Sequence, residues 1–257
     1  MNTNGVKIDE PTPLFTALLA NACSARAVLL LDCTGGPVDA TFVLYHAARH
    51  ALRRGVPVAF LALTRPATHH RAALRKFLGA HEGHVGVLCG WEAAGALAWS
   101  GGGAGALAAA LLSAAGAAAG GGAPGFLLCV EDALGVCELA GGIGEGLAVL
   151  RALCGSAQLG SLCVRLPARC DWRVPPEGGG PLLAPSLSSR LEALAGAVLT
   201  ARDLASGWSA EAHGTLEGAA GGGERGGCDA PPAPALLYKV APDGSVREVG
   251  QRSRVQP

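Results

Sequence analysis

The residues with the clearest chemical pattern form a loop between a predicted strand and a predicted helix. Residues 27–33 (AVLLLDC) are a short apolar run, which is typical of a strand buried on both faces. A glycine-containing loop and then a helical pattern follow this run. This is the layout of a phosphate-binding loop, in which backbone N–H groups and a lysine hold the phosphates of a nucleotide. The order of strand, loop and helix therefore predicts a place where a nucleotide could bind.

The loop itself lacks the residues that a nucleotide requires. Its candidate members are Gly35, Gly36, Pro37, Asp39 and Thr41. Counted from Gly35 the lysine of the motif falls on Thr41, and counted from Gly36 it falls on Phe42. Pro37 removes one backbone donor, and the carboxylate of Asp39 would repel a phosphate. We therefore expect a degenerate phosphate loop that binds no nucleotide, and we expect no catalytic residue and no cofactor.

An acidic pair follows a later apolar run, residues 126–130. Glu131 and Asp132 lie where a working nucleotidase holds Mg²⁺ through water. The first loop lacks the lysine and the hydroxyl that would bind a triphosphate, so this pair would have no bound nucleotide and metal ion to act on. We therefore interpret Glu131 or Asp132 as the cap of the next helix.

Other candidate motifs point to no chemistry. The pair His69 and His70, like His81 with His84, lacks a matched second pair at zinc spacing, so we expect surface histidines and no metal. The glycine-rich residues 141–146 match a dinucleotide fingerprint only on a loose count and do not directly follow a strand. No G-x-S-x-G nucleophile motif is present.

Basic side chains give the one positive signal for a partner. The first cluster consists of Arg65, His69, His70, Arg71, Arg75 and Lys76, and the second of Arg165, Arg169 and Arg173 with Trp172 among them. Arginine beside an aromatic ring can hold a phosphate backbone and stack a base. We interpret the first cluster as a solvated helix face. The second cluster is as compatible with contact to a nucleic acid as with a solvated loop.

The elements that position these residues alternate between strand and helix before an all-strand C-terminal part. Strands are predicted at 27–33, 56–63, 85–88, 126–130, 161–166, 197–201 and 207–216, and helices at 37–54, 67–78, 91–99, 104–119, 144–154 and 187–194. Residues 236–240 and 245–249 flank a Pro-Asp-Gly turn and predict a hairpin. The order predicts an α/β fold, a mostly parallel sheet with helices on both faces and antiparallel C-terminal strands, as in RecA-like nucleotidases.

Length and composition favour one large domain. A chain of 257 residues can bury a substantial core, and 20 basic against 20 acidic residues give no overall attraction to nucleic acid or membrane. Nine cysteines without a CxxC pair are typical of a reducing compartment, and no run predicts a membrane span. We divide the chain into an N-terminal arm (1–24), one domain (25–250) with Pro/Gly-rich insertions near 167–185 and 218–234, and a tail (251–257).

The sequence resembles the Elongator complex protein 6 family at three places between Ala25 and Val249. The first joins LLLDC at 29–33 to FVLYH at 42–46 through the degenerate loop. The second is PVAFLAL at 57–63, followed by THH at 68–70 and KFLG at 76–79. The third is LASGWSAEAHG at 204–214 with LYKV at 237–240 and the closing hairpin.

The resemblance implies a RecA-like three-layer sandwich without ATPase motifs, and a subunit that is not an enzyme. It implies a ring-shaped heterohexamer with Elongator subunits four and five, which binds tRNA and supports modification of wobble uridines at carbon five. It also implies a protein of the cytoplasm and the nucleus. The residues leave open an alternative, an active RecA-like ATPase with an atypical phosphate loop.

Overall fold

A single nine-stranded sheet organises the part of the chain that the structure describes. The computed structural model describes residues 16–20, 24–34, 39–78, 85–98, 102–120, 125–167, 186–204, 212–220, 235–241 and 246–251. The strands are β1 (Ala27–Cys33), β2 (Val58–Ala62), β3 (Val85–Cys89), β4 (Phe126–Val130), β5 (Leu159–Pro167), β6 (Ala197–Asp203), β7 (Gly214–Ala220), β8 (Leu236–Val240) and β9 (Val246–Gln251). The helices are α2 (Thr41–Arg53), α3 (Ala67–Leu78), α4 (Gly90–Ala98), α5 (Ala104–Ala118), α6 (Ala133–Leu139), α7 (Ile143–Gly155) and α8 (Leu187–Leu194).

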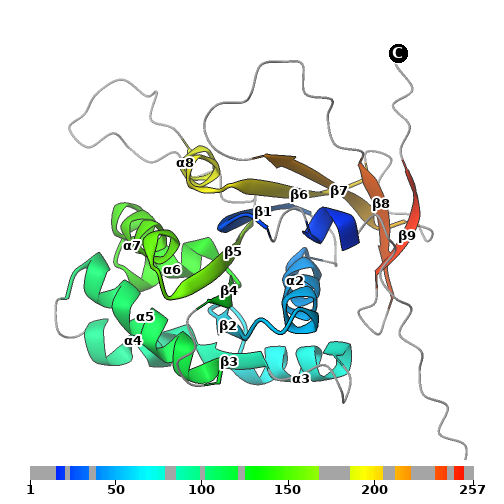
Figure 1. Ribbon diagram of the computed structural model, residues 1–257. Coiled ribbons are helices and arrows are strands. Elements are labelled where there is room, and N and C mark those ends of the chain that lie inside the picture. The colour runs from blue at the N-terminus through cyan, green and yellow to red at the C-terminus, as the bar shows by residue number, and fades with distance from the viewer. Residues whose placement is uncertain are drawn as a thin grey trace, which may run out of the picture.

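The sheet has the order β3-β2-β4-β5-β1-β6-β7-β8-β9 (Figure 1). Strands β1 to β6 pair in parallel, and β7, β8 and β9 add antiparallel pairs at one end. The chain moves toward β3 through α2 and α3 and returns toward β6 through α4 to α8. Because parallel crossovers are right-handed, the two groups of helices cover opposite faces of the sheet. The predicted mostly parallel sheet with antiparallel C-terminal strands is therefore confirmed.

Two hydrophobic cores lie on the two faces of the sheet. Side chains alternate between the faces along each strand, so that Leu30 of β1 packs toward α2 while Leu29 packs toward the helices of the other face. The strand β4 is buried along its whole length. Fully burying one such aliphatic side chain stabilises the fold by about 1.5–3 kcal/mol. Because helices cover both faces of these strands, their sequences are continuous apolar runs rather than alternating ones.

Several boundaries differ from the predictions. Helix α2 begins at Thr41, and Pro37 lies outside the described residues. Helix α6 was not predicted as a separate helix. Strand β7 lies further along the chain than the predicted 207–216, so Gly218, expected in a low-complexity insertion, pairs with Leu199 of β6. The reason is the antiparallel partner, because β6 supplies backbone hydrogen bonds to residues that have little strand propensity of their own.

The predicted N-terminal arm contributes to the core. Residues 16–20 are helical, and Leu19 is buried in the cluster that contains the core side of α2. The described cysteines are free thiols. Among the described residues no single helix is long and apolar enough to cross a membrane, and α6 with α7 passes a test of length and composition only as a pair bent by 113°.

Candidate functional site

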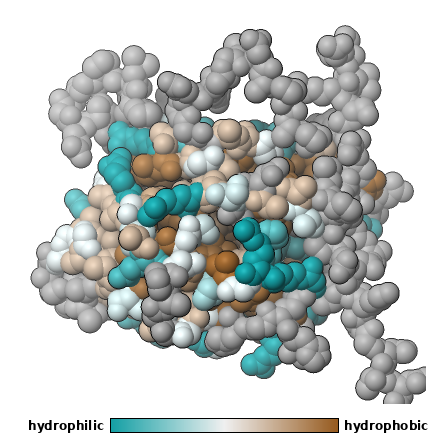
Figure 2. Space-filling view, viewed as in Figure 1, coloured by the Kyte–Doolittle hydropathy of each residue, from teal (hydrophilic) through white to brown (hydrophobic). Residues whose placement is uncertain are grey.

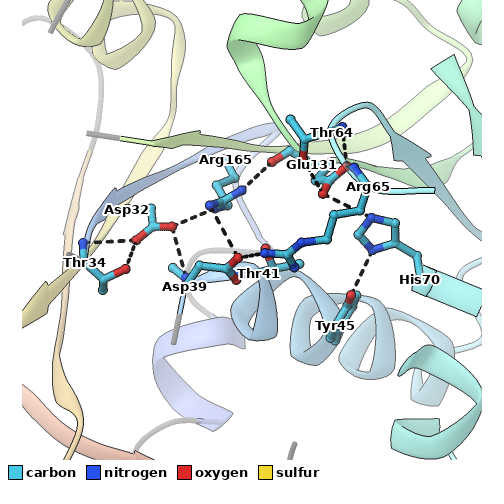
Figure 3. A network of polar contacts seen from close by, with 11 residues as sticks. Asp32, Thr34, Asp39, Thr41, Tyr45, Thr64, Arg65, His70, Glu131 and Arg165 are labelled. Atoms are coloured by element: carbon cyan, nitrogen blue, oxygen red, sulfur yellow. Dashed lines mark hydrogen bonds and ion pairs between the residues drawn. The ribbon is translucent and has the colours of Figure 1, made fainter. Parts of the chain in front are cut away.

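The carboxyl ends of the parallel strands bring the predicted site residues together. Strand β5 lies between β4 and β1. Asp32 lies one residue before the end of β1, Glu131 directly follows β4, and Arg165 lies two residues before the end of β5. Because parallel strands end at one edge of the sheet, these side chains meet there, beside the beginning of α2 (Figure 3).

Asp32 binds both ends of the degenerate phosphate loop. Its Oδ1 accepts hydrogen bonds from the backbone N and the Oγ1 of Thr34, at 3.1 and 2.5 Å. Its Oδ2 accepts from the backbone N of Ala40 at 3.1 Å and from Nε of Arg165 at 2.8 Å. The side chain of Asp32 is 3% exposed. The buried carboxylate is therefore fully satisfied and fixes the two ends of the loop at the edge of the sheet.

Asp39 places a second carboxylate at the beginning of α2. Its Oδ1 accepts from the backbone N of Thr41 at 3.0 Å. Its Oδ2 pairs with the guanidinium of Arg65 and lies 3.8 Å from Nη2 of Arg165. Two cations therefore converge on an anion that belongs to the chain itself. They do so at a helix N-terminus that follows a buried strand, which is where a phosphate binds in a working loop.

Thr41 occupies the lysine position of the motif when it is counted from Gly35. It is 1% exposed, and within the described part of the chain its Oγ1 has no hydrogen-bond partner. A buried hydroxyl supplies no charge that could replace the lysine. Gly35, Gly36 and Pro37 lie outside the described residues.

Glu131 binds the loop that follows β2. Its Oε2 accepts from the backbone N of Leu63 at 2.8 Å, of Thr64 at 2.9 Å and of Arg65 at 3.3 Å. Its Oε1 accepts from Oγ1 of Thr64 at 2.6 Å and lies 3.1 Å from Nε2 of His70. Burial alone would raise the pKa of Glu131, but the contacts with His70, Thr64 and Leu63 outweigh it and hold this pKa well below its usual range. The carboxylate is ionised, buried and already used by protein donors.

His70 links Glu131 to α2. The ring is 0% exposed, and its Nδ1 lies 2.8 Å from the hydroxyl of Tyr45. Burial raises the pKa of Tyr45, and Glu131 raises it further. The hydroxyl of Tyr45 and Nδ1 of His70 form a hydrogen bond, and Nε2 of the same ring faces Oε1 of Glu131. The chain of Tyr45, His70 and Glu131 ties α2, α3 and the end of β4 together (Figure 3).

The prediction that His70 lies at the surface is wrong. The signal that was missed is helical spacing, because His70, Leu74, Phe77 and Leu78 form the buried stripe of α3. His69 is exposed, whereas His81 and His84 lie outside the described residues. Within the described ranges, no three side chains of the metal-binding types gather in a group that could hold an ion.

Asp132 begins the next helix, and its interpretation as a cap is confirmed. Its Oδ1 accepts from the backbone N of Leu134 at 2.8 Å, in the first turn of α6. Burial raises the pKa of Asp132. The two neighbouring acids thus have different roles, because Asp132 caps a helix while Glu131 holds a loop.

Arg165 does not lie where a tRNA contact requires it. The residue is 7% exposed, and it donates from Nε to Asp32 and from Nη1 to the backbone carbonyl of Glu131 at 3.3 Å. A buried guanidinium with these partners cannot reach a nucleic-acid phosphate. Arg169, Trp172 and Arg173 lie outside the described residues.

Sequence reasoning also missed the role of Asp32. The available signal was a lone carboxylate close to the end of an otherwise apolar strand. Such a charge is expensive to bury unless it is paired. The ion pair of Asp32 with Arg165 could not be predicted from the sequence, because the two residues are 133 positions apart.

Comparison with known proteins shows the fold. No protein-family model and no curated protein sequence matches the chain. Among solved structures it is similar to the crystal structure of the KaiC-like protein PH0186 from the hyperthermophilic archaeon Pyrococcus horikoshii, with a TM-score of 0.53 and 12% identity. The likeness covers 87% of this chain and 88% of that chain. The neighbour is a RecA-type domain, and together with the sheet topology the likeness shows that this chain has a RecA-like fold.

Proposed function

We propose that this chain is a RecA-like subunit that does not hydrolyse ATP. The observation that carries the proposal is the convergence of Arg65 and Arg165 on the carboxylate of Asp39. Proteins with this fold usually hydrolyse ATP, and cations at this edge would then hold phosphates. Here a triphosphate would have to displace an internal anion and would meet its repulsion. The lysine that could offset this repulsion is absent from the sequence.

The state of Glu131 supports the same proposal. A catalytic acid at this position must reach a hydrated metal ion. The carboxylate of Glu131 is 0% exposed and accepts from the backbone and hydroxyl groups of Leu63 and Thr64. Releasing it for a metal would leave the buried N–H of Leu63 without its acceptor, at about 1–3 kcal/mol, and would also break the contacts with Thr64.

We further propose that the chain is the RecA-like subunit that the resemblance to Elongator complex protein 6 implies. It would form a heterohexameric ring with Elongator subunits four and five, in the cytoplasm and nucleus, and the ring would bind tRNA and support wobble-uridine modification. The support consists of the three resembling stretches, the RecA-like fold and an edge that is closed by internal ion pairs. A subunit whose sheet edge is closed in this way would support the assembly of the ring, and another subunit would catalyse the modification.

Co-expression tests the assembly. The chain should be poorly soluble alone and should purify in a stable complex with Elongator subunits four and five. The assembled mass should correspond to a heterohexamer. A monodisperse monomer without affinity for either subunit would contradict the proposal.

The tRNA contact is proposed for Arg169 and Arg173, with Trp172 as the aromatic neighbour. Replacing both arginines by alanine should weaken tRNA binding by the assembled ring and reduce its salt slope by about 2, without blocking assembly. Arg151→Ala, which removes an exposed arginine of α7, is the matched control and should leave binding unchanged. Equal affinities of the double variant and the control would remove this segment from the proposal.

The alternative function is an active ATPase with an atypical phosphate loop, and the RecA-like fold favours it. In that case Asp39 must release Arg65 and Arg165 when a nucleotide enters. Asp39→Asn distinguishes the two functions. The non-catalytic proposal predicts that the wild type binds no ATP and that only the variant, with both cations released, gains weak affinity for it.

A further inference from the structure

Strand β3 lies at one end of the nine-stranded sheet, where one of its two edges faces away from β2 (Figure 1). In the part of the chain that the structure describes, no strand pairs with this outer edge. The sequence of β3 is VGVLC, five residues without charge or proline. A strand edge of this composition is a template on which a strand of another molecule can pair.

The peptide groups of β2 alternate between its two neighbouring strands. The carbonyl oxygen of Pro57, just before β2, accepts from the backbone N of Leu127 in β4 at 2.9 Å. The carbonyl oxygen of Leu61 accepts from the backbone N of Glu131, directly after β4, at 3.1 Å. Both carbonyl groups therefore face β4. Because successive residues of a strand point their peptide groups to opposite sides, Phe60 faces β3 instead.

This alternation determines which residues of β3 point outward. Phe60 lies opposite Val87 in the parallel register. In a parallel pair a residue bonds to the two neighbours of the residue opposite it, so Phe60 bonds to β3 on either side of Val87. The N–H and C=O of Val87 therefore point away from β2. Those of Val85 and Cys89, each two residues away, do the same and complete the outer row.

One side chain covers the middle of this outer row. Nη2 of Arg71 in α3 donates to the carbonyl oxygen of Val87 at 2.9 Å. Arg71 is exposed, and hydrophilic side chains gather over α2 and α3 on the face that Figure 2 shows. The guanidinium thus places a positive charge and a bound donor at the centre of the edge, which is one way in which proteins protect an edge strand.

We propose that Arg71 closes the outer edge of β3 against pairing with β3 of a second copy of this chain. The edge is self-complementary, because an antiparallel pair centred on Val87 places Val85 opposite Cys89 of the second copy. The outward peptide groups can then form hydrogen bonds between the two strands. Such pairing must displace Arg71 from Val87 in both copies and bring two like charges together. This inference goes beyond the proposed function and does not depend on it.

Sedimentation velocity of the full chain, alone or in whichever complex keeps it soluble, tests the closed edge. Arg71→Ala should self-associate at protein concentrations at least about tenfold below those that the wild type needs, because each copy loses a hydrogen bond from a charged donor. Arg71 is exposed, so its truncation opens no cavity in the core. Arg71→Lys keeps a charged donor and should behave like the wild type.

Arg75→Ala is the matched control, because it removes the same charge from an exposed position one turn further along α3. It should leave self-association unchanged. Equal self-association of Arg71→Ala and Arg75→Ala, or none in either, would overturn the proposal.

Hydrogen exchange identifies the surface that associates. In the associated Arg71→Ala protein the amides of Val85, Val87 and Cys89 should be protected relative to the wild type, because their outward N–H groups would bond to the second copy. Self-association without protection of these three amides would also overturn the proposal, because another surface would then hold the copies together.

Discussion

The two faces of the sheet hold their helices in different ways. The face of α2 and α3 contains the buried acids Asp32 and Glu131, the buried base Arg165 and the ring of His70. The face of α4 to α8 is packed mainly by Leu, Val and Ala, and α5 contains only Ala, Gly, Leu and Ser. Both faces contain an apolar core, and the first face adds a set of satisfied buried polar groups at the strand ends. The difference teaches that the carboxyl-end edge of this sheet is held to α2 and α3 by buried polar contacts, which the other face lacks among its described residues.

Removal of the Glu131 carboxylate should have the largest effect. Glu131→Ala leaves the backbone donors of Leu63 and Thr64 and the ring of His70 without their acceptor. We expect a loss of about 3–5 kcal/mol in the free energy of unfolding, measured by denaturation of the protein alone or in its complex. Glu138→Ala, an exposed acid of α6, should change it by less than about 0.5 kcal/mol. Similar losses in the two variants would contradict the contrast between the faces.

The stabilisation by Glu131 should also depend on pH. Its pKa in the folded protein is lowered, so its contribution is fully present above the ordinary value of 4.5 and is lost as the pH falls toward the folded value. Glu131→Gln removes this ionisation. The difference in stability between the wild type and this variant should therefore shrink as the pH falls below about 4.5. A difference that grows in acid would show that the carboxylate is protonated in the folded state.

Loss of Arg165 should have the next largest effect. Arg165→Ala leaves Asp32 buried with only its N–H and hydroxyl donors, which we expect to cost about 3 kcal/mol. The double variant Asp32→Asn/Arg165→Met removes both charges and should cost less than the sum of Asp32→Asn and Arg165→Met alone. A double-mutant cycle of unfolding free energies measures this coupling. Strict additivity would mean that the two charges do not act as a pair.

A smaller effect is expected on the apolar face. A Cβ at Gly86 of β3 would lie 2.1 Å from the backbone oxygen of Ala118 in α5, so Gly86→Ala should cost about 1–3 kcal/mol. Gly105→Ala, in the same helix as Ala118, meets nothing within 4 Å. Thermal denaturation should show it to be neutral or stabilising by up to about 1 kcal/mol. If Gly86→Ala and Gly105→Ala changed the thermal stability equally, close packing between strand and helix would not be what stabilises this face.

The sequence predicted elements better than it predicted contacts. The limits of β1, β4, α3 and α8 agree with the structure, because apolar runs and helical spacing define them locally. The site depends on pairs that are distant in the sequence, such as Thr64 with Glu131, 67 residues apart. The residue types of the site were visible in the sequence, but no local sequence pattern predicts which of these residues contact one another. Helix α6 was missed because seven residues carry too little periodicity to separate them from a turn.

Titration of ATP with Mg²⁺ by calorimetry, on the chain alone or in its complex, tests the central claim most directly. The ion pairs of Asp39 with Arg65 and Arg165 predict no binding at millimolar nucleotide. Binding with a micromolar dissociation constant, lost when Arg65 and Arg165 are replaced by alanine, would contradict the account. The edge of the sheet would then be a working nucleotide site.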